Sequence, residues 1–372
     1  MVRGPGGTVN RPTLAVVNTY RRYTGSTLAA KAYFRAFGEL GLGPTWVQCV
    51  SSRNAADWDS EGTVVRGTTL FRADLNLVLN ALFVFPRRLA ELREEVVFLT
   101  DPILLGACPR LKRSIVLVHD LREFGPARRS WAAEQVYRRL FRHIDSAERL
   151  VCVSAATRDR LVEIARPDRP IEVLPHCAGL RGDPAGHLAR SRARLEADRT
   201  VRVLYLSADR EYKNLPMFCR LAAAFREPAD GLRYRFTLVS QLWPSTRRLV
   251  DRLALPNLTV VPEVPDLATL YEATDVLVHP SREEGFGLPL AEAMQFGIPI
   301  LGSNIPAVRE TLGPSGIVLP PDDLDGWAAA LRGLVEPGRF AAAARASADR
   351  GRTYTYESFL DRVRTWLPSW AA

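Results

Sequence analysis

Carboxylates and glycines near residue 285 form a pattern that could hold a phosphate-bridged ligand. Gly285 and Gly287 have no Cβ, so their backbone can approach a ligand closely. A helix is expected to begin at Pro289, because proline is well tolerated at the first helical position. The unpaired N–H groups of a helix start favour phosphate. Glu284 and Glu292 flank this start, so each carboxylate could bind hydroxyls at one end of a nucleotide-diphospho-sugar.

The same residues have plainer interpretations when each is taken alone. Glu292, which we expect in the first helical turn, is favoured there by the helix dipole without any ligand. The glycines on either side of Phe286 could form only a tight turn. The complete ordered string is harder to explain in this way, so it favours a binding function.

A longer string carries the pattern, and it reads Pro280-Ser281-x-x-Glu284-Gly285-Phe286-Gly287-Leu288-Pro289-x-x-Glu292-Ala293. This string resembles the signature of the family-4 retaining glycosyltransferases, which have the GT-B fold. The following segment resembles the continuation of that signature and reads Gly297-Ile298-Pro299-Ile300-x-Gly302-Ser303-x-Ile305-Pro306-x-x-x-Glu310. The resemblance covers the chain from about residue 201 to its end.

The resemblance implies a role for each matching residue. Glu292 is expected to bind the ribose hydroxyls of the donor nucleotide, and Glu284 is expected to act in catalysis beside the hydroxyls of the donor sugar. The sugar and the distal phosphate are expected to be held by the backbone amides of Gly285, Phe286, Gly287 and Leu288.

A diphosphate also needs positive charge nearby. Lys213 matches the lysine that the family places after the first strand of the second half, although an exposed lysine at a helix start is the plainer interpretation. Ser207 and Ala208 stand where the family usually has an arginine, and Arg210 is the nearest candidate. Val264 is expected near the nucleobase, and an ordinary connecting loop explains it equally well.

The first half resembles the family less closely. His119 and Asp120 match a strand-end pair of the family, which implies that His119 lies beside the reacting sugar. Asp120 could orient that histidine, bind an acceptor hydroxyl or form a turn. Gly25 is the glycine left in the loop 18–26, where relatives usually show a pair, so this loop could shape an unusual acceptor pocket or be an ordinary surface loop. Ser154 belongs to another family-like string and could equally cap a helix.

Short apolar runs alternate with amphipathic stretches along the chain. Strands are predicted at 14–17, 46–50, 96–100, 115–119, 150–154, 171–174, 201–206, 236–239, 258–261, 276–279, 298–302 and 317–319. Helices are predicted at 26–40, 130–144, 155–165, 215–226, 245–254, 267–273, 290–296, 308–312, 325–335 and 356–366. This alternation indicates parallel sheets with crossover helices. It stops in residues 178–200, which are rich in Gly, Arg and Ala, so we place a domain boundary there.

These elements predict an α/β fold of two doubly wound parallel-sheet, Rossmann-like domains that face each other across a cleft, as in the GT-B type. We expect residues 1–190 to bind the acceptor and residues 191–355 to bind the nucleotide-sugar donor. A helix in residues 356–372 is expected to cross back toward the first domain. Ligands of such sheets bind at the carboxyl ends of the strands, here in the cleft.

Length and composition agree with two domains. The chain has 372 residues, and about 150 residues per domain is usual. No apolar run reaches the roughly 18 residues needed to span a bilayer, and no secretory segment is seen at the start, so a cytoplasmic location is expected. The five cysteines are widely spaced and are expected to be buried, reduced thiols.

The net charge of +9 is unevenly distributed. Residues 1–200 contain 31 Lys and Arg against 21 Asp and Glu, a balance of +10, which leaves −1 for residues 201–372. This excess suggests an anionic acceptor or an anionic membrane surface near the first half, or only a solvated basic face.

We therefore expect retaining transfer of a hexosyl group from a nucleotide-diphospho-sugar to a hydroxyl of a glycan, lipid-linked or small-molecule acceptor. The resemblance implies no metal or other cofactor, and Asp323-Leu324-Asp325 is typical of a helix cap. A nucleotide-sugar epimerase or a phosphorylase with the same two-domain fold is an alternative. Binding of nucleic acid is not expected, because the basic residues of Arg138-Arg139-Leu140-Phe141-Arg142 have the spacing of an ordinary helix.

Overall fold

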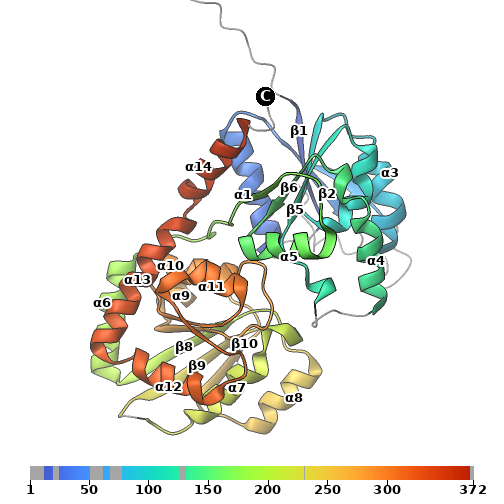
Figure 1. Ribbon diagram of the computed structural model, residues 1–372. Helices are drawn as coiled ribbons and strands as arrows, with labels where there is room; N and C mark the ends of the chain where they lie inside the picture. The colour runs from blue at the N-terminus through green and yellow to red at the C-terminus, as the bar shows by residue number, and fades with distance from the viewer. Residues whose placement is uncertain are drawn as a thin grey trace, which may run out of the picture.

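The computed structural model describes residues 12–19, 25–50, 62–67, 78–125, 131–229 and 231–368. These residues form two lobes, each built on one parallel β-sheet flanked by helices (Figure 1). The predicted α/β fold with two doubly wound sheets is confirmed. No helix of the described residues is long and apolar enough to cross a membrane.

The first sheet has seven strands in the order β3-β2-β1-β4-β5-β6-β7. Its strands are β1 (Leu14–Asn18), β2 (Thr45–Val50), β3 (Thr63–Arg66), β4 (Val96–Leu99), β5 (Arg113–Val118), β6 (Arg149–Cys152) and β7 (Ile171–Val173). The second sheet has the order β10-β9-β8-β11-β12-β13. Its strands are β8 (Thr200–Leu206), β9 (Arg233–Val239), β10 (Leu258–Val261), β11 (Val276–His279), β12 (Ile300–Ser303) and β13 (Ile317–Leu319).

The helices follow the strands, as expected for crossover connections. In the first lobe they are α1 (Gly25–Glu39), α3 (Phe85–Leu89), α4 (Trp131–Phe141) and α5 (Ala155–Ala165), with a π-helix at Asn80–Val84 and a 3₁₀-helix at Pro102–Arg110. In the second lobe they are α6 (Pro184–Asp198), α7 (Leu215–Ala224), α8 (Pro244–Leu253), α9 (Leu267–Glu272), α10 (Leu288–Gln295), α11 (Pro306–Leu312), α12 (Leu324–Leu334) and α13 (Pro337–Gly351). The last helix is α14 (Tyr356–Trp366).

Helix α6 occupies most of residues 178–200, where the sequence predicts a domain boundary. Asp183 caps this helix by accepting a hydrogen bond from the backbone N–H of Gly186 at 3.0 Å, and Pro184 opens it. The buried His187 reaches the carbonyl of Thr274 at 2.7 Å, so α6 packs on the second lobe. The predicted boundary between residues 190 and 191 therefore falls inside a helix. The sequence does not predict this helix, because its residues are mostly Gly, Ala and Arg and few of them are apolar.

Helix α14 packs against α1 at the other end of the molecule (Figure 1). The ring of Phe359 lies edge-on to Tyr33, with ring centroids 4.9 Å apart, and Trp366 lies 6.5 Å from Phe37. These rings belong to one continuous hydrophobic cluster that also includes Phe286 of the second lobe. The chain therefore returns to the first lobe after it has completed the second, and the shared cluster joins the two lobes.

Candidate active site

The segment between β11 and α10 is placed at the point where strand order reverses in the second sheet. Strand β8 lies between β9 and β11, so the loops that follow β8 and β11 leave the sheet side by side. Such a switch point is the usual ligand site of a doubly wound sheet. Gly287, at φ 93°, precedes α10, which begins at Leu288. Glu292 consequently lies in the second turn of α10, and its expected place in the first turn is wrong.

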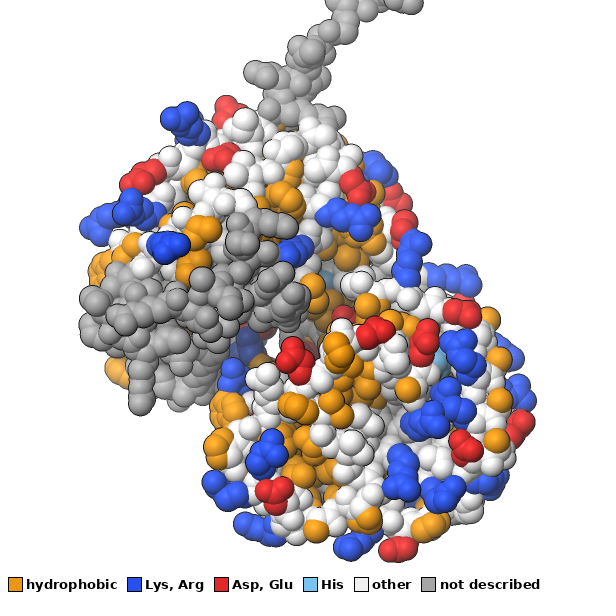
Figure 2. All heavy atoms as spheres, turned by 180° about the vertical axis from the view of Figure 1, so that it is seen from behind, with side chains coloured by type: hydrophobic (Ala, Val, Ile, Leu, Met, Phe, Trp, Pro, Cys, Tyr) orange, Lys and Arg blue, Asp and Glu red, His pale blue; other side chains and the backbone are white. Residues whose placement is uncertain are grey.

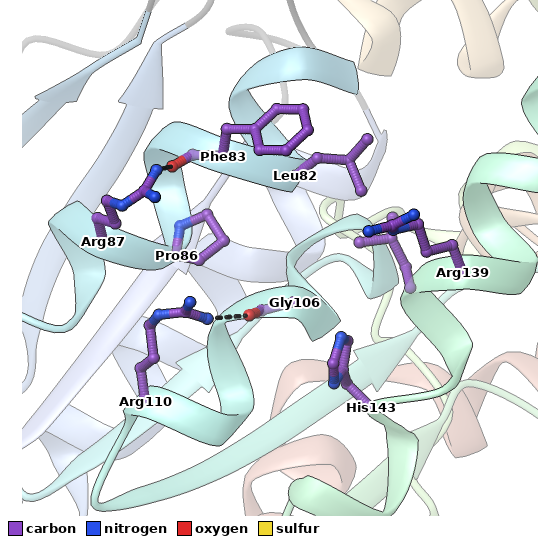
Figure 3. Close-up of a pocket in the computed structure, with 9 residues that line it drawn as sticks. Leu82, Phe83, Pro86, Arg87, Gly106, Arg110, Arg139 and His143 are labelled. Carbon is purple, nitrogen blue, oxygen red and sulfur yellow. Dashed lines mark hydrogen bonds between the residues drawn. The ribbon is translucent and has the colours of Figure 1, made fainter.

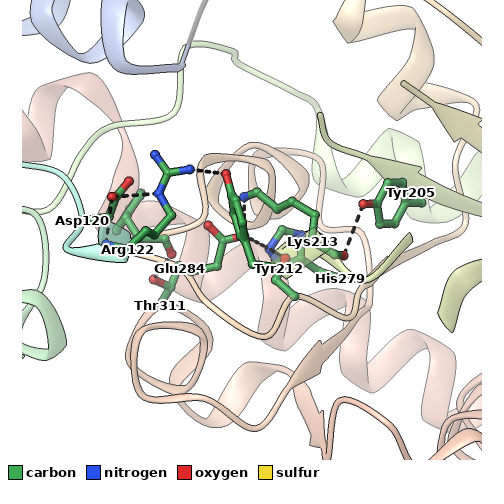
Figure 4. A network of polar contacts seen from close by, with 10 residues as sticks. Asp120, Arg122, Tyr205, Tyr212, Lys213, His279, Glu284 and Thr311 are labelled. Atoms are coloured by element: carbon green, nitrogen blue, oxygen red, sulfur yellow. Dashed lines mark hydrogen bonds and ion pairs between the residues drawn. The ribbon is translucent and has the colours of Figure 1, made fainter. Parts of the chain in front are cut away.

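Glu284 lies at the centre of a polar network on this loop (Figure 4). Its Oε1 atom accepts a hydrogen bond from Nζ of Lys213 at 2.6 Å and lies 2.7 Å from Nε2 of His279. The side chain of Glu284 is 8% exposed. Burial alone would raise its pKa, but Lys213 and His279 together hold the pKa well below its ordinary value. Glu284 is therefore an ionised, fixed hydrogen-bond acceptor at neutral pH.

Lys213 reaches Glu284 from a short 3₁₀-helix, Glu211–Lys213, that follows β8. The hydroxyl of Tyr205 donates to the carbonyl of Lys213 at 3.2 Å and fixes the backbone of this turn. Arg210 is directed elsewhere, since its guanidinium lies over the ring of Trp243 at 5.0 Å. Among the described residues, Arg210 forms no ion pair with Glu284. The structure thus brings together Lys213 and Glu284 but not Arg210.

Glu292 lies apart from that network, in a largely apolar surrounding. It is 5% exposed, and its Oε2 atom accepts a hydrogen bond from the hydroxyl of Tyr271 at 2.8 Å. Tyr271 in turn stacks on Phe296, with ring centroids 5.5 Å apart. Burial raises the pKa of Glu292 to about 7, although the hydrogen bond from Tyr271 opposes this rise. The two carboxylates of the signature therefore have opposite properties: Glu284 is held ionised, and Glu292 titrates near neutrality.

His119 follows β5 and meets the glycine loop through its backbone. A Cβ on Gly285 would lie 1.7 Å from the carbonyl oxygen of His119, so only glycine permits this contact. The ring of His119 is buried, and its Nδ1 lies 3.1 Å from Nε2 of His176. Burial lowers the pKa of His119 to about 4, so the ring is neutral at pH 7. His119 is predicted to lie beside the reacting sugar, and its backbone carbonyl lies against the glycine loop.

Asp120 is part of a connection across the cleft. Its Oδ1 atom lies 2.8 Å from Nε of Arg122, whose Nη1 donates to the hydroxyl of Tyr212 in the second lobe (Figure 4). Burial would raise the pKa of Asp120, but the charge of Arg122 lowers it below its ordinary value. Tyr212 is the neighbour of Lys213, so this connection ends beside the Glu284 network.

Helix α5 of the first lobe also meets the glycine loop. The carbonyl of Gly285 accepts hydrogen bonds from the hydroxyls of Ser154 and Thr157, at 2.6 and 3.2 Å. Ser154 also caps α5 by accepting from the backbone N–H of Thr157 at 3.0 Å, so its capping interpretation is confirmed. Glu310 accepts from the N–H groups of residues 155 and 156, at 2.7 and 2.9 Å. A carboxylate of the second lobe thus binds the positive end of a first-lobe helix.

The remaining predicted residues are placed as follows. A Cβ on Gly25 would lie 3.1 Å from Leu288, so the start of α1 faces the start of α10 across the cleft. Val264 is half-buried and packs against the hydrophobic cluster that joins the lobes. Residues 20–24 of the first loop lie outside the described residues. Asp323 accepts from the N–H of Gly326 at 3.0 Å, so its role as a helix cap is confirmed.

Four residues of the site have no assigned role in the sequence reasoning. They are Arg122, His176, Tyr212 and His279. His279 carries a detectable signal, since it ends a predicted strand just before the signature. Arg122 and Tyr212 become neighbours only when the lobes meet, and His176 meets His119 only when the first lobe folds, so their spacing in the chain contains no such signal.

The described residues contain no cluster of metal-ligating side chains and no disulfide. Within them, no group of three or more His, Cys, Asp or Glu side chains is arranged to hold a metal ion. The five cysteines are free and buried, which confirms the expectation of reduced thiols.

The two parallel-sheet lobes face each other, and the glycine loop and Glu284 lie where the lobes meet, which we call the seam. This arrangement places the chain in the class of GT-B enzymes. Two family models match the chain: "Glycosyltransferase Family 4" at residues 35–178 and "Glycosyl transferases group 1" at residues 200–337. The chain therefore belongs to the family-4 type glycosyltransferases of GT-B fold. The family resemblance noted in the sequence is confirmed, and it extends to the first lobe.

Curated relatives point to the same family. The chain is 28% identical over 239 residues to O-antigen chain mannosyltransferase B of Escherichia coli, and the match covers 58% of this chain and 59% of the relative. It is 30% identical over 258 residues to D-inositol 3-phosphate glycosyltransferase of Rhodococcus jostii, and this match covers 63% of this chain and 54% of the relative. The matches thus span somewhat more than half the length of these relatives.

Solved structures share the whole fold at low sequence identity. Sucrose-phosphate synthase from Thermosynechococcus elongatus has a TM-score of 0.77 at 17% identity and covers 96% of this chain and 99% of its own. The Anabaena protein HepE in complex with UDP-glucose has a TM-score of 0.73 at 15% identity and covers 96% of this chain and 100% of its own. At these identities the likeness concerns the fold alone.

Proposed function

We propose that the protein transfers a hexosyl group from a nucleotide-diphospho-sugar to an acceptor hydroxyl with retention of anomeric configuration. The observation that carries this proposal is the Lys213–Glu284–His279 network at the switch point of the second sheet, opposite the carbonyl of His119. It combines a cation for the diphosphate, an ionised acceptor for sugar hydroxyls and a first-lobe group at one seam. The names of the relatives are those of transferases, which favours transfer over the epimerase alternative.

The chemistry proposed for this seam requires no covalent enzyme intermediate. The bond between the anomeric carbon and the diphosphate oxygen breaks, and a bond from that carbon to the acceptor oxygen forms on the same face. The departing phosphate takes the acceptor proton. Lys213 and the amides of residues 285–288 stabilise the negative charge on the leaving group. The carbonyl dipole of His119 favours the positive charge that develops on the sugar, and Glu284 orients the sugar hydroxyls.

The donor should place its nucleoside against α10. Glu292 is proposed to bind the ribose hydroxyls, with Val264 near the base. The Anabaena structure that shares the fold was solved with UDP-glucose, which supports a nucleotide-sugar donor here. Lys213 supplies positive charge at the diphosphate, so we propose that no metal ion or other cofactor is required.

The acceptor is proposed to be hydroxylated and anionic. The name D-inositol 3-phosphate glycosyltransferase of one relative and the name O-antigen chain mannosyltransferase B of another support a small phosphorylated polyol or a lipid-linked glycan. Asp120 and Arg122 lie on the first-lobe side of the seam, where they could contact such an acceptor. The proposed place of action is the cytoplasm or the cytoplasmic face of a membrane, and no nucleic-acid partner is proposed.

Thermal unfolding with a panel of nucleotide-sugars tests the donor part of this proposal. UDP-, GDP-, ADP- and dTDP-linked hexoses are added separately to the full chain. We expect one nucleotide series to raise Tm by a few degrees, because a ligand at about 100 times its Kd stabilises the folded state by about 2.7 kcal/mol. The variant Lys213→Ala should lose most of this shift.

The matched control is Lys112→Ala, which removes an exposed lysine of the first lobe and should keep the full shift. The proposal fails if no nucleotide-sugar raises Tm, or if Lys213→Ala responds to the donor as strongly as the control does.

A further inference from the structure

A cavity of about 260 Å³ lies on the flank of the first lobe, away from the seam between the lobes. It is formed by the π-helix at Asn80–Val84 with α3, by the 3₁₀-helix at Pro102–Arg110, and by the end of α4 (Figure 3). None of its lining residues belongs to the candidate active site. The glycosyl-transfer function therefore does not account for this cavity.

The polar part of the lining is entirely basic. Arg87, Arg110, Arg139 and His143 come from three different segments and line the cavity (Figure 3), and no Asp or Glu of the described residues lines it. Nη1 of Arg87 donates to the carbonyl of residue 83 at 2.8 Å, and Nη1 of Arg110 donates to Gly106 at 3.5 Å. A guanidinium has five N–H donors, so each arginine keeps further donors for an anion.

The lack of carboxylates matters because other arginines nearby do have acidic partners. Arg138, on the same helix as Arg139, pairs with Glu134 at 2.7 Å, and Arg113 pairs with Glu148 at 2.7 Å. Within the described residues, the three arginines of the cavity form no ion pair with a carboxylate. In the part of the chain that the structure describes, no carboxylate therefore neutralises their charges.

The rest of the lining is mostly apolar. Leu82, Phe83, Pro86 and Leu140 contribute to it, and Phe83 is 51% exposed. Because a large, half-exposed aromatic side chain lies beside a group of arginines, the cavity favours a ligand that has both an anionic and an apolar part. Small-molecule sites usually occupy roughly 300 Å³ or more, so a cavity of this size suits a head group rather than a whole nucleotide.

We propose that this cavity binds a phosphate group that carries an apolar substituent. The guanidinium groups of Arg87, Arg110 and Arg139 would bind the phosphate oxygens, as arginine forks do in phosphate sites. Phe83 and Leu82 would contact the substituent. A phosphorylated membrane lipid and a soluble phosphate ester share this chemistry.

The state of His143 agrees with this geometry. Burial lowers the pKa of His143 below its ordinary value, and the positive charges of Arg110 and Arg139 lower it further. The positive charges around the cavity thus disfavour protonation of His143. A bound anion would reduce this repulsion between positive charges.

Calorimetric titration of the full chain with hexyl phosphate, and separately with inorganic phosphate, tests the site. Hexyl phosphate should bind at least tenfold more tightly than inorganic phosphate, because only the ester has an apolar part. The double variant Arg110→Gln/Arg139→Gln should weaken binding of hexyl phosphate at least tenfold. The matched control Lys112→Gln/Arg142→Gln removes two exposed charges from the same region, outside the lining, and should change binding less than twofold.

Co-sedimentation with vesicles identifies the source of the phosphate. Binding to phosphatidylcholine vesicles that contain phosphatidic acid, lost in the cavity variant and kept in the control, would assign a membrane lipid. Binding of hexyl phosphate without vesicle binding would assign a soluble ester, and both outcomes support the site. The proposal is overturned if neither probe binds, or if control and cavity variants lose binding equally. The donor-induced Tm shift should be the same in both variants, so the proposed transferase function is tested separately.

Discussion

At the scale of residues, Glu284 and Glu292 show how one signature creates two different carboxylates. Glu284 is ionised because Lys213 and His279 lower its pKa, whereas Glu292 is buried with the hydroxyl of Tyr271 as its partner and has a pKa of about 7. The sequence pattern places both residues in the site, but it does not distinguish their charge states. That difference depends on burial and on partners such as Tyr271, which is distant in the chain from the motif.

Replacing Glu284 tests its proposed role directly. Glu284→Gln keeps the shape of the side chain but cannot accept as strongly from Lys213 and His279, and it cannot orient sugar hydroxyls as an anion. We expect turnover to fall by about 100-fold or more, as is typical when a preorganised electrostatic group is lost. Circular dichroism should remain unchanged, and the exposed Glu272→Gln serves as the control. Unchanged turnover in Glu284→Gln would remove this residue from the mechanism.

Glu292 gives the stability of the protein a predicted dependence on pH. Its pKa rises from 4.5 to about 7 on folding, so the folded state binds the proton more tightly than the unfolded state. This group therefore stabilises the fold at low pH, and its contribution is lost as pH rises through about 7. At 1.36 kcal/mol per unit, the loss is on the order of 3 kcal/mol.

The measurement is Tm between pH 5.5 and 8 for the protein and for Glu292→Gln, which stays neutral throughout. We expect the difference in Tm between the two proteins to shift by a few degrees in favour of the variant as pH rises. If the difference is constant over this range, Glu292 is not a titrating buried carboxyl.

At the scale of elements, most strands are predictable, because each is a short run of apolar residues, and the central strands β1, β4, β11 and β12 are buried along their whole length. Helix α6 is not predictable in this way, since it is rich in arginine and is held by its cap and by His187. Strand β3 at the sheet edge was also missed, as its burial pattern shows only one buried residue. The sequence predicts the signature loop itself. It does not predict the contacts of this loop with α5 and with the end of β5, because these contacts join separate lobes.

The close contact between Gly285 and the first lobe can be tested by adding a single methyl group at this position. A Cβ at this position would lie 1.7 Å from the carbonyl oxygen of His119, so Gly285→Ala requires the lobes to separate locally. We expect turnover to fall by more than tenfold and small-angle scattering to show an increased radius of gyration.

Gly179→Ala is the matched control, since nothing lies within 4 Å of the added Cβ there. Equal turnover and equal radius of gyration in the two glycine variants would contradict the close approach of Gly285 to His119.

At the scale of the whole molecule, the uneven charge follows the two lobes approximately. Basic and acidic side chains are intermixed over the second lobe on the face shown in Figure 2, in agreement with the balance of −1 for residues 201–372, which form most of this lobe. In the first lobe, part of the excess is concentrated in the arginine-lined cavity beside α4. The sequence reveals the imbalance, but only the fold brings Arg87, Arg110 and Arg139 together.

Chelation tests whether protein charges are sufficient at the diphosphate. Because Lys213 supplies a fixed cation at the seam, we expect turnover to change less than twofold after dialysis against EDTA. A large loss that Mg²⁺ or Mn²⁺ restores would show that a metal ion is required.

The central claim is retaining transfer at the seam between the lobes, and NMR of the product tests it most directly. The protein is mixed with the α-linked nucleotide-hexose that raises its Tm, labelled with ¹³C at the anomeric carbon, and with a phosphorylated polyol. Glu284→Gln is the parallel sample. We predict a new glycosidic anomeric signal with the larger one-bond ¹³C–¹H coupling of an α-linkage, formed by the protein and strongly reduced in the variant. A β-linked product, or an α-linked product formed equally fast by Glu284→Gln, would contradict the account.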